Sequence, residues 1–469
     1  MAKYYLAVDI GASSGRHILG HLEEGKIVLE EVYRFENGME KRDGHLCWNL
    51  PHLFEEILNG LAACKMAGKI PASMGIDTWA VDYVLLDGQD QVIGRTYGYR
   101  DGRTEGMDEE VYRLIPEEEL YARTGIQKQP FNTIYQLMAV KKQEPQHMEA
   151  AQSFLMLPDY FHFLLTGNKV SEYTNATSTQ LVSPETKQWD MELIERLGYK
   201  KSLFAPLSMP GTVVGKLKRE IEERVGFSCE VVLPATHDTA SAVISVPALS
   251  EDCLYISSGT WSLMGIENEQ AICTPESRQQ NFTNEGGYEY RFRYLKNIMG
   301  LWMIQSARHE WKDAYSFAKL CEMAEEENDF PSRVDVNDAC FMAPESMIEA
   351  IREFCRRTGQ AEPETVGQTA AVIYQSLAES YADTVGQIER ITGRTFPAIN
   401  IVGGGSNAEY LNQLTADKSD RCVYAGPSEA TAIGNLAVQM VKDGLFQMLE
   451  EVRSCIYASF GVKKYEPKA

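Results

Sequence analysis

The sequence predicts an α/β protein of two large domains, built as a duplicated nucleotide-binding fold with a cleft between its halves. The apolar stretch 6–10 is typical of a buried strand and leads into a turn of small residues, hydroxyls and an arginine at 11–16. A partly similar motif follows at 254–262, where another strand leads into a Ser/Gly/Thr turn. A chain of 469 residues is also too long for one ordinary core and suits two domains.

The elements of the first half follow from hydrophobic periodicity. Strands are expected at 6–10, 15–22 and 26–35, followed by a helix over 49–67 with apolar side chains at helical spacing. Further strands are expected at 73–78 and 82–88. Three strands, a helix and a strand is not the alternating order of a dinucleotide-binding fold.

The middle and the second half of the chain have their own strand and helix signals. The region 108–225 is helix-rich, and 231–242 is a short strand running into a helix of small residues. The polar segment 247–252 predicts a boundary between domains 1–246 and 250–469. A helix over 366–392 leads into a strand and glycine turn at 398–407, and another helix starts within 427–436.

Composition restricts the classes of partner. The formal net charge of −22 disfavours nucleic acid and anionic membranes, which would repel the chain. A local site of cations and backbone amides can still bind a phosphorylated ligand. We therefore expect small-molecule partners, no nucleic acid, no membrane, and a monomer or weak homo-oligomer.

The cysteines and the N-terminus indicate a compartment. Ten cysteines form no C-x-x-C pair, so neither a zinc ribbon nor a thioredoxin-type site is indicated, and buried thiols are expected. The first apolar run is broken by Asp9, which is not typical of a signal peptide. No run of about 18 apolar residues predicts a transmembrane helix. A reduced cytoplasm is the expected location.

The turn after the first strand is the candidate phosphate site. The P-loop signature is absent. The segment nearest to it, 211–217, is one residue short between its glycines and has Leu217 where a P-loop has a metal-binding hydroxyl. Turn amides, Ser13, Ser14 and Arg16 can donate to phosphate, and Asp9 can hold Mg²⁺ through water. The alternative is an ordinary hairpin with a structural arginine. Similar strand-to-turn units at 257–260 and 403–405 favour the phosphate interpretation.

Asp238 is the candidate general base. A carboxylate at a helix start is often only a cap, and that alternative carries equal weight from local sequence. Phosphoryl transfer needs a base for the attacking hydroxyl, and a helix N-terminus is expected to keep Asp238 ionised at neutral pH. His237 is either a core histidine or a partner for a sugar hydroxyl, and local sequence does not separate the two.

Other candidates lie in mixed polar and aromatic segments. Trp79, Asp82 and Tyr83 suit a polyol, whose apolar faces stack and whose hydroxyls pair, although packing under a loop is as reasonable. Asn297 and Gln305 lie where a small loop is expected to meet a helix. Each of these amides is more often a surface or capping group than a ligand.

Together these segments resemble the FGGY family of carbohydrate kinases, which shares its fold with actin, hexokinase and the heat-shock ATPases. The similarity is specific in combination and follows the family's order through 9–16, 77–83, 131–137, 237–242, 258–262, 297–302 and 403–405. It implies two actin-like ATPase (ribonuclease H-like) domains, each a mixed five-stranded sheet flanked by helices.

The resemblance also implies an activity and its residues. The motifs are most similar to those of members that use ATP, with Mg²⁺ as cofactor, to phosphorylate L-rhamnulose at its C1 hydroxyl. Asp238 would be the catalytic base and Asp9 the metal residue. The ATP contacts would be Ala12, Ser13, Ser14, Gly15, Arg16, Thr260, Gln305 and Gly404. The sugar contacts would be Ala80, His237, Asp238, Thr239 and Asn297.

One departure keeps the sugar open. Ala80 stands where the family pattern leads us to expect glycine, and its methyl group could narrow the pocket. The alternative is a kinase for another ketose or polyol, such as L-fuculose, xylulose or glycerol. A chaperone-like ATPase would need a β-rich module after the second domain, and a sugar-sensing regulator a helix-turn-helix with a basic face; neither pattern is evident.

Overall fold

The computed structural model describes residues 2–248, 250 and 252–468, and the chain forms two compact units, both discontinuous in sequence. Unit 1 comprises 1–245, 267–294 and 431–459, and unit 2 comprises 246–266, 295–430 and 460–469. The predicted boundary at 247–252 lies just after the first passage between units, although its positions 249 and 251 lie outside the described residues. Segments 267–294 and 431–459, which we predicted in the second domain, belong to unit 1.

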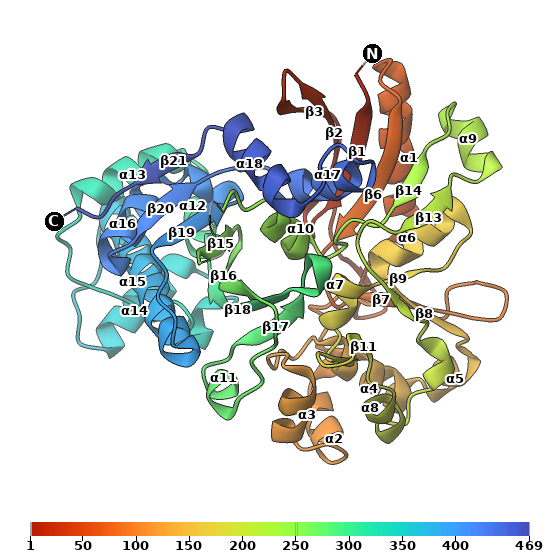
Figure 1. Ribbon diagram of the computed structural model, residues 1–469. Coiled ribbons are helices and arrows are strands. Elements are labelled where there is room, and N and C mark those ends of the chain that lie inside the picture. Colours follow the sequence, from red (N-terminus) through yellow and green to blue (C-terminus); the bar gives the residue numbers. More distant parts are fainter. Residues whose placement is uncertain (1, 249, 251, 469) are drawn as a thin grey trace. The chain divides into compact units, whose positions relative to one another are not determined.

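Unit 1 is built on a mixed sheet with the order β13-β14-β6-β1-β2-β3 (Figure 1). Its strands are β1 (Tyr4–Ile10), β2 (Ser14–Glu23), β3 (Lys26–Glu36), β6 (Pro71–Thr78), β13 (Val213–Lys216) and β14 (Glu230–Val232). β1, β2 and β3 form an antiparallel meander, and β6 pairs in parallel with both β1 and β14. The predicted order of three strands, a helix and a strand is therefore confirmed.

Paired short strands lie outside this main sheet: β4 (Glu40–Arg42) with β5 (His45–Cys47), β7 (Tyr83–Leu86) with β8 (Ser153–Met156), β9 (Ser171–Glu172) with β12 (Leu207–Ser208), and β10 (Val182–Ser183) with β11 (Gln188–Trp189). The strand predicted at 82–88 is thus β7, in a two-stranded ribbon.

The helices of unit 1 are α1 (Leu50–Met66), α2 (Met107–Tyr112), α3 (Glu117–Thr124), α4 (Thr133–Gln143), α5 (Pro145–Ala150), α6 (Leu157–Thr166), α7 (Tyr173–Thr177), α8 (Met191–Arg196), α9 (Arg219–Val225), α10 (Asp238–Ile244), α11 (Pro275–Gln279), α17 (Ala430–Lys442, from its second residue) and α18 (Leu449–Ser459). They confirm the helix-rich character predicted for 108–225.

Helix α1 shows why the local sequence succeeds. Asn49 caps its start by accepting a hydrogen bond from His52 N, and a proline occupies its first turn, where no intrahelical N–H is needed. Its apolar face, including Leu53 and Ile57, is buried with Leu6 and Val8 of β1 in one core cluster. This is the amphipathic pattern from which the helix was predicted.

Unit 2 contains most of a second mixed sheet, and residues 267–294 contribute its remaining strand residues. Within the described residues, the strand order is β17-β18-β16-β15-β19-β20-β21. Its strands are β15 (Leu254–Ser258), β16 (Trp261–Asn268), β17 (Thr283–Gly286), β18 (Phe292–Met299), β19 (Ala398–Val402), β20 (Cys422–Ala425) and β21 (Lys463–Tyr465). The helices of unit 2 are α12 (Trp302–Glu310), α13 (Phe317–Glu326), α14 (Met347–Arg357), α15 (Val366–Thr392) and α16 (Glu409–Ser419).

The two sheets repeat one pairing scheme, as expected for a duplicated fold. The central strands β1 and β15 each have an antiparallel neighbour on one side, β2 or β16. On the other side, β6 or β19 is parallel, and so is the next strand, β14 or β20. The prediction of five strands in each sheet is wrong. Within the described residues, short edge strands such as β13 and β21 extend the two sheets to six and seven strands.

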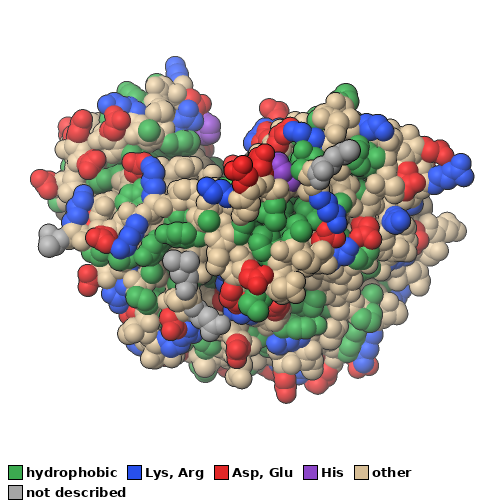
Figure 2. Space-filling model, turned by 45° about the horizontal axis from the view of Figure 1, so that its top comes forward, with side chains coloured by type: hydrophobic (Ala, Val, Ile, Leu, Met, Phe, Trp, Pro, Cys, Tyr) green, Lys and Arg blue, Asp and Glu red, His purple; other side chains and the backbone are tan. Residues whose placement is uncertain are grey.

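Other sequence expectations are met in the described chain. Helix α15 has the bounds expected for it. All ten cysteines are free, and five of them are buried. Among the described residues, no helix has the length and apolar character needed to cross a bilayer. Acidic and basic side chains are interspersed on the face shown in Figure 2.

Helix α17 packs so closely on α10 that it tolerates only glycine at one position. A Cβ atom at Gly434 would lie 1.8 Å from the carbonyl oxygen of Ser241. We predict that Gly434→Ala lowers the free energy of unfolding by about 2–3 kcal/mol, because backbone would have to move. The matched control is Gly386→Ala in α15, where a Cβ meets open space; it should stabilise by about 0.5–1 kcal/mol. Denaturant unfolding of both variants tests this, and equal effects would contradict it.

Candidate functional site

The first predicted phosphate turn joins β1 to β2 in unit 1. Gly11 N donates to Ser14 O at 2.9 Å and closes the turn. Asp9, 8% exposed, lies opposite Arg16 in the strand pairing, and Arg16 Nη2 donates to Asp9 Oδ2 at 2.7 Å. The arginine therefore neutralises the carboxylate that precedes the turn, while its predicted contact with phosphate stays a prediction.

A second carboxylate lies beside Asp9. The parallel pairing of β1 with β6 places Asp77 in register with Asp9, and Asp77 is fully buried. Asn435 of α17 donates to Asp77 Oδ2 at 2.6 Å. Burial, reinforced by the Asp9 carboxylate, raises the pKa of Asp77 well above its usual range. Sequence reasoning gave Asp77 no role, although a carboxylate near the end of a strand parallel to β1 was the available signal.

Asp238 is the first residue of α10, and its side chain is 33% exposed. Its Oδ1 accepts hydrogen bonds from Thr239 N at 2.6 Å and Thr239 Oγ1 at 3.2 Å. Burial of the carboxyl group, with a further contribution from Asp9, raises the pKa of Asp238 to about 7. The expectation that the helix start would keep Asp238 fully ionised at neutral pH is therefore wrong: loss of hydration and a like charge outweigh the terminus of a seven-residue helix.

His237 is held between charged neighbours. It is 6% exposed, and its Nε2 lies 3.5 Å from Asp238 Oδ1. On its other side, Arg293 Nη2 lies 3.1 Å from Nδ1, and Glu285 Oε2 lies 3.4 Å from the same nitrogen. Burial and the arginine charge lower the pKa of His237 well below its usual value. His237 is thus a neutral imidazole next to the candidate base; nothing in the local sequence marked Arg293 or Glu285.

The loop that leads to His237 is fixed by a buried glutamate. Glu172 Oε2 accepts from Thr236 Oγ1 at 2.7 Å and from Thr236 N at 3.2 Å. The same carboxylate caps α7 through Thr174 N and Asn175 N. These bonds tie the loop between β14 and α10 to the start of helix α7, at the residue before His237.

Trp79 and Asp82 form a structural network in this unit. Asp82 Oδ2 accepts hydrogen bonds from Trp48 Nε1, Trp79 Nε1 and Tyr99 N at 2.6, 2.9 and 3.1 Å. Its Oδ1 accepts from Gln136 Nε2 at 3.0 Å. Asp82 is 1% exposed, and burial raises its pKa to about 6. The predicted polyol contact is not supported for Asp82, whose oxygens already serve these donors; Ala80, half-buried, lies inside the loop they hold.

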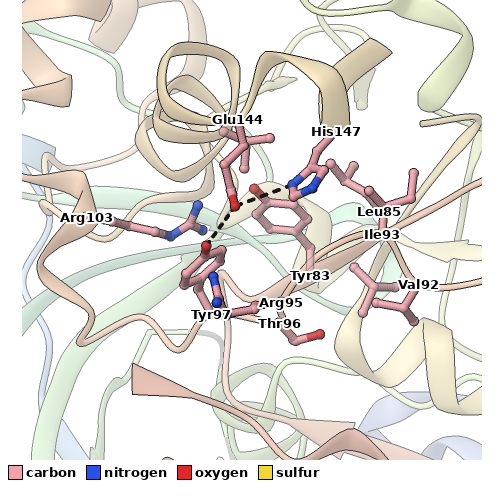
Figure 3. Close-up of a pocket in the computed structure, with 12 residues that line it drawn as sticks. Tyr83, Leu85, Val92, Ile93, Arg95, Thr96, Tyr97, Arg103, Glu144 and His147 are labelled. Atoms are coloured by element: carbon pink, nitrogen blue, oxygen red, sulfur yellow. Dashed lines mark hydrogen bonds and ion pairs between the residues drawn. The ribbon is translucent and has the colours of Figure 1, made fainter. Parts of the chain in front are cut away.

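Tyr83 faces a different part of unit 1. It lines a small pocket with Tyr97, Arg103, Glu144 and His147 (Figure 3). Tyr97 Oη donates to Glu144 Oε1 at 3.1 Å, and His147 Nδ1 lies 3.5 Å from the same oxygen. None of the other residues predicted to contact sugar or ATP lines this pocket, so Tyr83 stands apart from them.

Unit 2 brings three predicted motifs into one place. The turn between β15 and β16 is closed by Gly259 N donating to Trp261 O at 2.8 Å. Leu301 N donates to Gly259 O at 3.0 Å and Trp302 N to Thr260 O at 3.1 Å, which joins this turn to the start of α12. The third motif follows β19, where a Cβ at Gly405 would lie 1.9 Å from Ser258 Oγ.

The remaining predicted residues lie around these turns. Gly404 begins the single-turn helix η5 (Gly404–Asn407), and a Cβ there would meet open space. Asn297 is a residue of β18 and not of a loop as expected, and its buried Oδ1 has no hydrogen-bond partner among the described residues. Gln305 lies half-buried in α12.

Comparisons with known protein families match both the N-terminal and the C-terminal part of the chain. The model of the N-terminal domain of the FGGY family of carbohydrate kinases matches residues 4–245, and that of the C-terminal domain matches 254–442. The chain belongs to the FGGY family of carbohydrate kinases. It is therefore a phosphotransferase that acts on a carbohydrate.

Relatives and solved structures of FGGY kinases agree with this membership. A rhamnulokinase of Halalkalibacterium halodurans is 53% identical over 98% of both chains, and one of Oceanobacillus iheyensis is 50% identical over 99% of this chain and 98% of its own. A xylulose kinase structure from Lactobacillus acidophilus has a TM-score of 0.81 at 17% identity, covering 99% of this chain and 94% of its own. At that identity, the likeness shows the shared fold.

The hydrogen bonds to Asp82 generate a stability prediction. Both oxygens of Asp82 accept hydrogen bonds from N–H groups. In Asp82→Asn, one of these two positions becomes an NH₂ group that cannot accept, whichever way the amide is turned. We expect the free energy of unfolding to fall by about 2–4 kcal/mol, because buried donors lose their acceptor. The matched control is Asp87→Asn, which keeps the Oδ1 that accepts from Gln89 N and Gln91 N at the protein surface. Thermal and denaturant unfolding decide the matter; a stable Asp82→Asn protein would refute the role assigned to this network.

Proposed function

We propose that the protein uses ATP to phosphorylate L-rhamnulose at its C1 hydroxyl, giving L-rhamnulose 1-phosphate and ADP. One observation carries the choice of sugar: relatives 40 to 53% identical to this chain, over at least 94% of their own lengths, are named rhamnulokinases. The carboxylate of Asp238, beside a neutral histidine, supports the phosphoryl-transfer chemistry.

In this proposal Asp238 is the general base. Thr239 holds Oδ1 through two hydrogen bonds, which leaves Oδ2 to accept the proton of the C1 hydroxyl. The hydroxyl oxygen forms a bond to the γ-phosphorus as the bond between that phosphorus and the leaving ADP oxygen breaks. A base with a pKa near the working pH suits this step, because it is both ionised and basic.

Ligand contacts are proposed within each unit. In unit 1, Ala12, Ser13, Ser14, Gly15 and Arg16 would contact phosphate, and Ala80, His237, Asp238 and Thr239 the sugar. In unit 2, Thr260, Gln305 and Gly404 would contact ATP, and Asn297 a sugar hydroxyl. The open space at Gly404 and the unpartnered Oδ1 of Asn297 support these two assignments.

Mg²⁺ is proposed at Asp9, through water. Carboxylate oxygens suit this hard cation, which usually keeps several waters and takes phosphate oxygens as ligands. Within the described residues no group of three or more His, Cys, Asp and Glu side chains forms a metal cluster, so a site with few protein ligands fits the chain. When bound, the ion would offset phosphate charge.

The substrate is tested by a coupled assay of ADP release with L-rhamnulose, L-fuculose, xylulose and glycerol at equal concentration. L-Rhamnulose should give the highest kcat/KM. The variant Ala80→Gly should change the ranking of sugars more than it changes the KM for ATP, because the methyl group it removes is proposed to face the sugar. If another ketose ranks first, that sugar replaces L-rhamnulose in the proposal.

The base is tested by Asp238→Asn, which keeps the shape of the side chain and removes its proton affinity. We expect kcat to fall at least about 100-fold, in line with the loss of a general base. Nucleotide affinity, measured by calorimetry with an ATP analogue, should stay within about threefold. Retained turnover would assign the base elsewhere.

The pKa of Asp238 predicts a pH profile. Only the ionised carboxylate accepts a proton, so kcat/KM should be constant above about pH 7 and fall tenfold for each pH unit below it. Excess Mg²⁺ should move this limb to lower pH, because a cation near Asp9 favours the ionised form of Asp238. The profile is measured with sugar below its KM, and a flat profile between pH 5 and 8, a range in which a pKa of about 7 must show itself, would contradict the assignment.

A further inference from the structure

An arginine without solvent contact determines which nitrogen of His237 carries a proton. Arg293 is 0% exposed, and its Nη2 lies 3.1 Å from His237 Nδ1. A guanidinium group only donates hydrogen bonds and stays protonated in proteins. Nδ1 must therefore be the acceptor in this contact, and the proton of a neutral His237 must be on Nε2.

The arginine is itself fixed in this orientation. Its Nε donates to Gly286 O at 3.0 Å, and its Nη2 lies 3.1 Å from Glu285 Oε2. Gly286 is itself held in place, because its N–H donates a hydrogen bond to Thr177 Oγ1 at 2.8 Å. The fork of Arg293 thus has little freedom to turn away from His237.

We propose that Arg293 is a positioning residue that keeps His237 neutral with its proton on Nε2, so that Nε2–H points to Asp238 and to the hydroxyl that Asp238 deprotonates. The role toward the hydroxyl rests on the proposed function; the role toward the tautomer does not. Nε2 lies 3.5 Å from Asp238 Oδ1, the oxygen that accepts the hydrogen bond of Thr239 N.

Glu285 shows what Arg293 prevents. Its Oε2 lies 3.4 Å from His237 Nδ1, close enough to take a hydrogen bond from a protonated Nδ1. Without the arginine, this carboxylate would favour an imidazolium or the opposite tautomer. An imidazolium next to Asp238 would stabilise the ionised carboxylate and make it a weaker base, and the opposite tautomer would present a lone pair in place of the Nε2–H donor.

The test combines a tautomer measurement with kinetics. The protein is labelled with ¹⁵N-histidine, and the resonance of His237 among the eight histidines is assigned from its loss in His237→Gln. In the ligand-free protein we expect the ¹⁵N shifts of a neutral ring protonated on Nε2. In Arg293→Met we expect the shifts of an imidazolium or of the opposite tautomer. Wild-type shifts in Arg293→Met, or a wild-type ring protonated on Nδ1, would overturn the proposal.

Kinetics use the sugar that ranks first in the substrate assay. Arg293→Met should lower kcat about 10- to 100-fold and raise the KM for sugar, with the KM for ATP unchanged. Arg293→Lys, which keeps a charged donor, should retain the tautomer and recover most of the loss. Equal kcat values for the wild type and Arg293→Met would refute the positioning role, whereas inactivity of the wild type on L-rhamnulose alone would refute only the proposed substrate.

A double variant covers the case in which Arg293→Met does not fold. Arg293→Met combined with Glu285→Leu leaves no unpaired charge buried, and such replacements of buried ion pairs are often tolerated. It should also lose the fixed tautomer and about 10- to 100-fold in kcat. A double variant with wild-type kcat and wild-type His237 shifts would overturn the proposal.

The chain offers a matched control at the other end of α10, the helix that begins directly after His237. Arg453 of α18 is 6% exposed, donates to Val243 O at 3.0 Å at the end of α10, and pairs with Glu267 Oε2 at 2.6 Å. Arg453→Met combined with Glu267→Leu removes a similar buried pair without touching His237. It should leave the His237 shifts unchanged; a change as large as in Arg293→Met would mean that any buried arginine beside α10 has this effect.

Discussion

The parallel pairing of β1 with β6 is the constraint on which the site in unit 1 depends. It places the carboxylates of Asp9 and Asp77 in register on neighbouring strands, where two like charges in a buried environment disfavour each other. The fold accommodates them with two donors of different kinds. Arg16 lies across the hairpin from Asp9, and the Asn435 amide reaches Asp77 from α17. A neutral donor suits Asp77, whose pKa burial raises, since it can bond to that carboxyl group without requiring it to be ionised.

This accommodation explains why the segment 431–459 belongs to unit 1. Gln439 Nε2 donates to Leu6 O at 2.9 Å and to Asn435 Oδ1 at 2.8 Å, and its Oε1 accepts from Ser73 Oγ at 2.7 Å. These polar groups are buried, so each would cost free energy if it lost its partner. Helix α17, which lies in sequence between β20 and β21 of the second sheet, therefore bonds to strands of the first sheet. A division of the sequence into two consecutive domains does not describe these contacts.

Local patterns were sufficient for most elements and for the phosphate-type turns, because strand alternation, helix capping and glycine content are properties of neighbouring residues. The helix at 366–392 and the meander of the first three strands follow directly from such patterns. Edge strands such as β13 lack a pattern of their own, since only pairing defines them. Asp82 and Arg293 show the same limit at the site. Trp48, which bonds to Asp82, and His237, which faces Arg293, come from other segments, and no spacing along the chain connects them.

The placement of the arginines around Asp238 has a chemical consequence. Arg16 bonds to Asp9, and Arg293 bonds to His237, while the described hydrogen bonds and ion pairs of Asp238 involve Thr239 and His237 and include no lysine or arginine. A cation bonded directly to Asp238 would favour its ionised form and lower its pKa, and the carboxylate would then accept a proton poorly. Each arginine instead bonds to a neighbour of Asp238, and burial together with the Asp9 carboxylate raises the pKa of Asp238 to about 7. The same arrangement gives each of these arginines a partner and preserves the proton affinity of the candidate base, because no described hydrogen bond or ion pair joins either arginine to Asp238 itself.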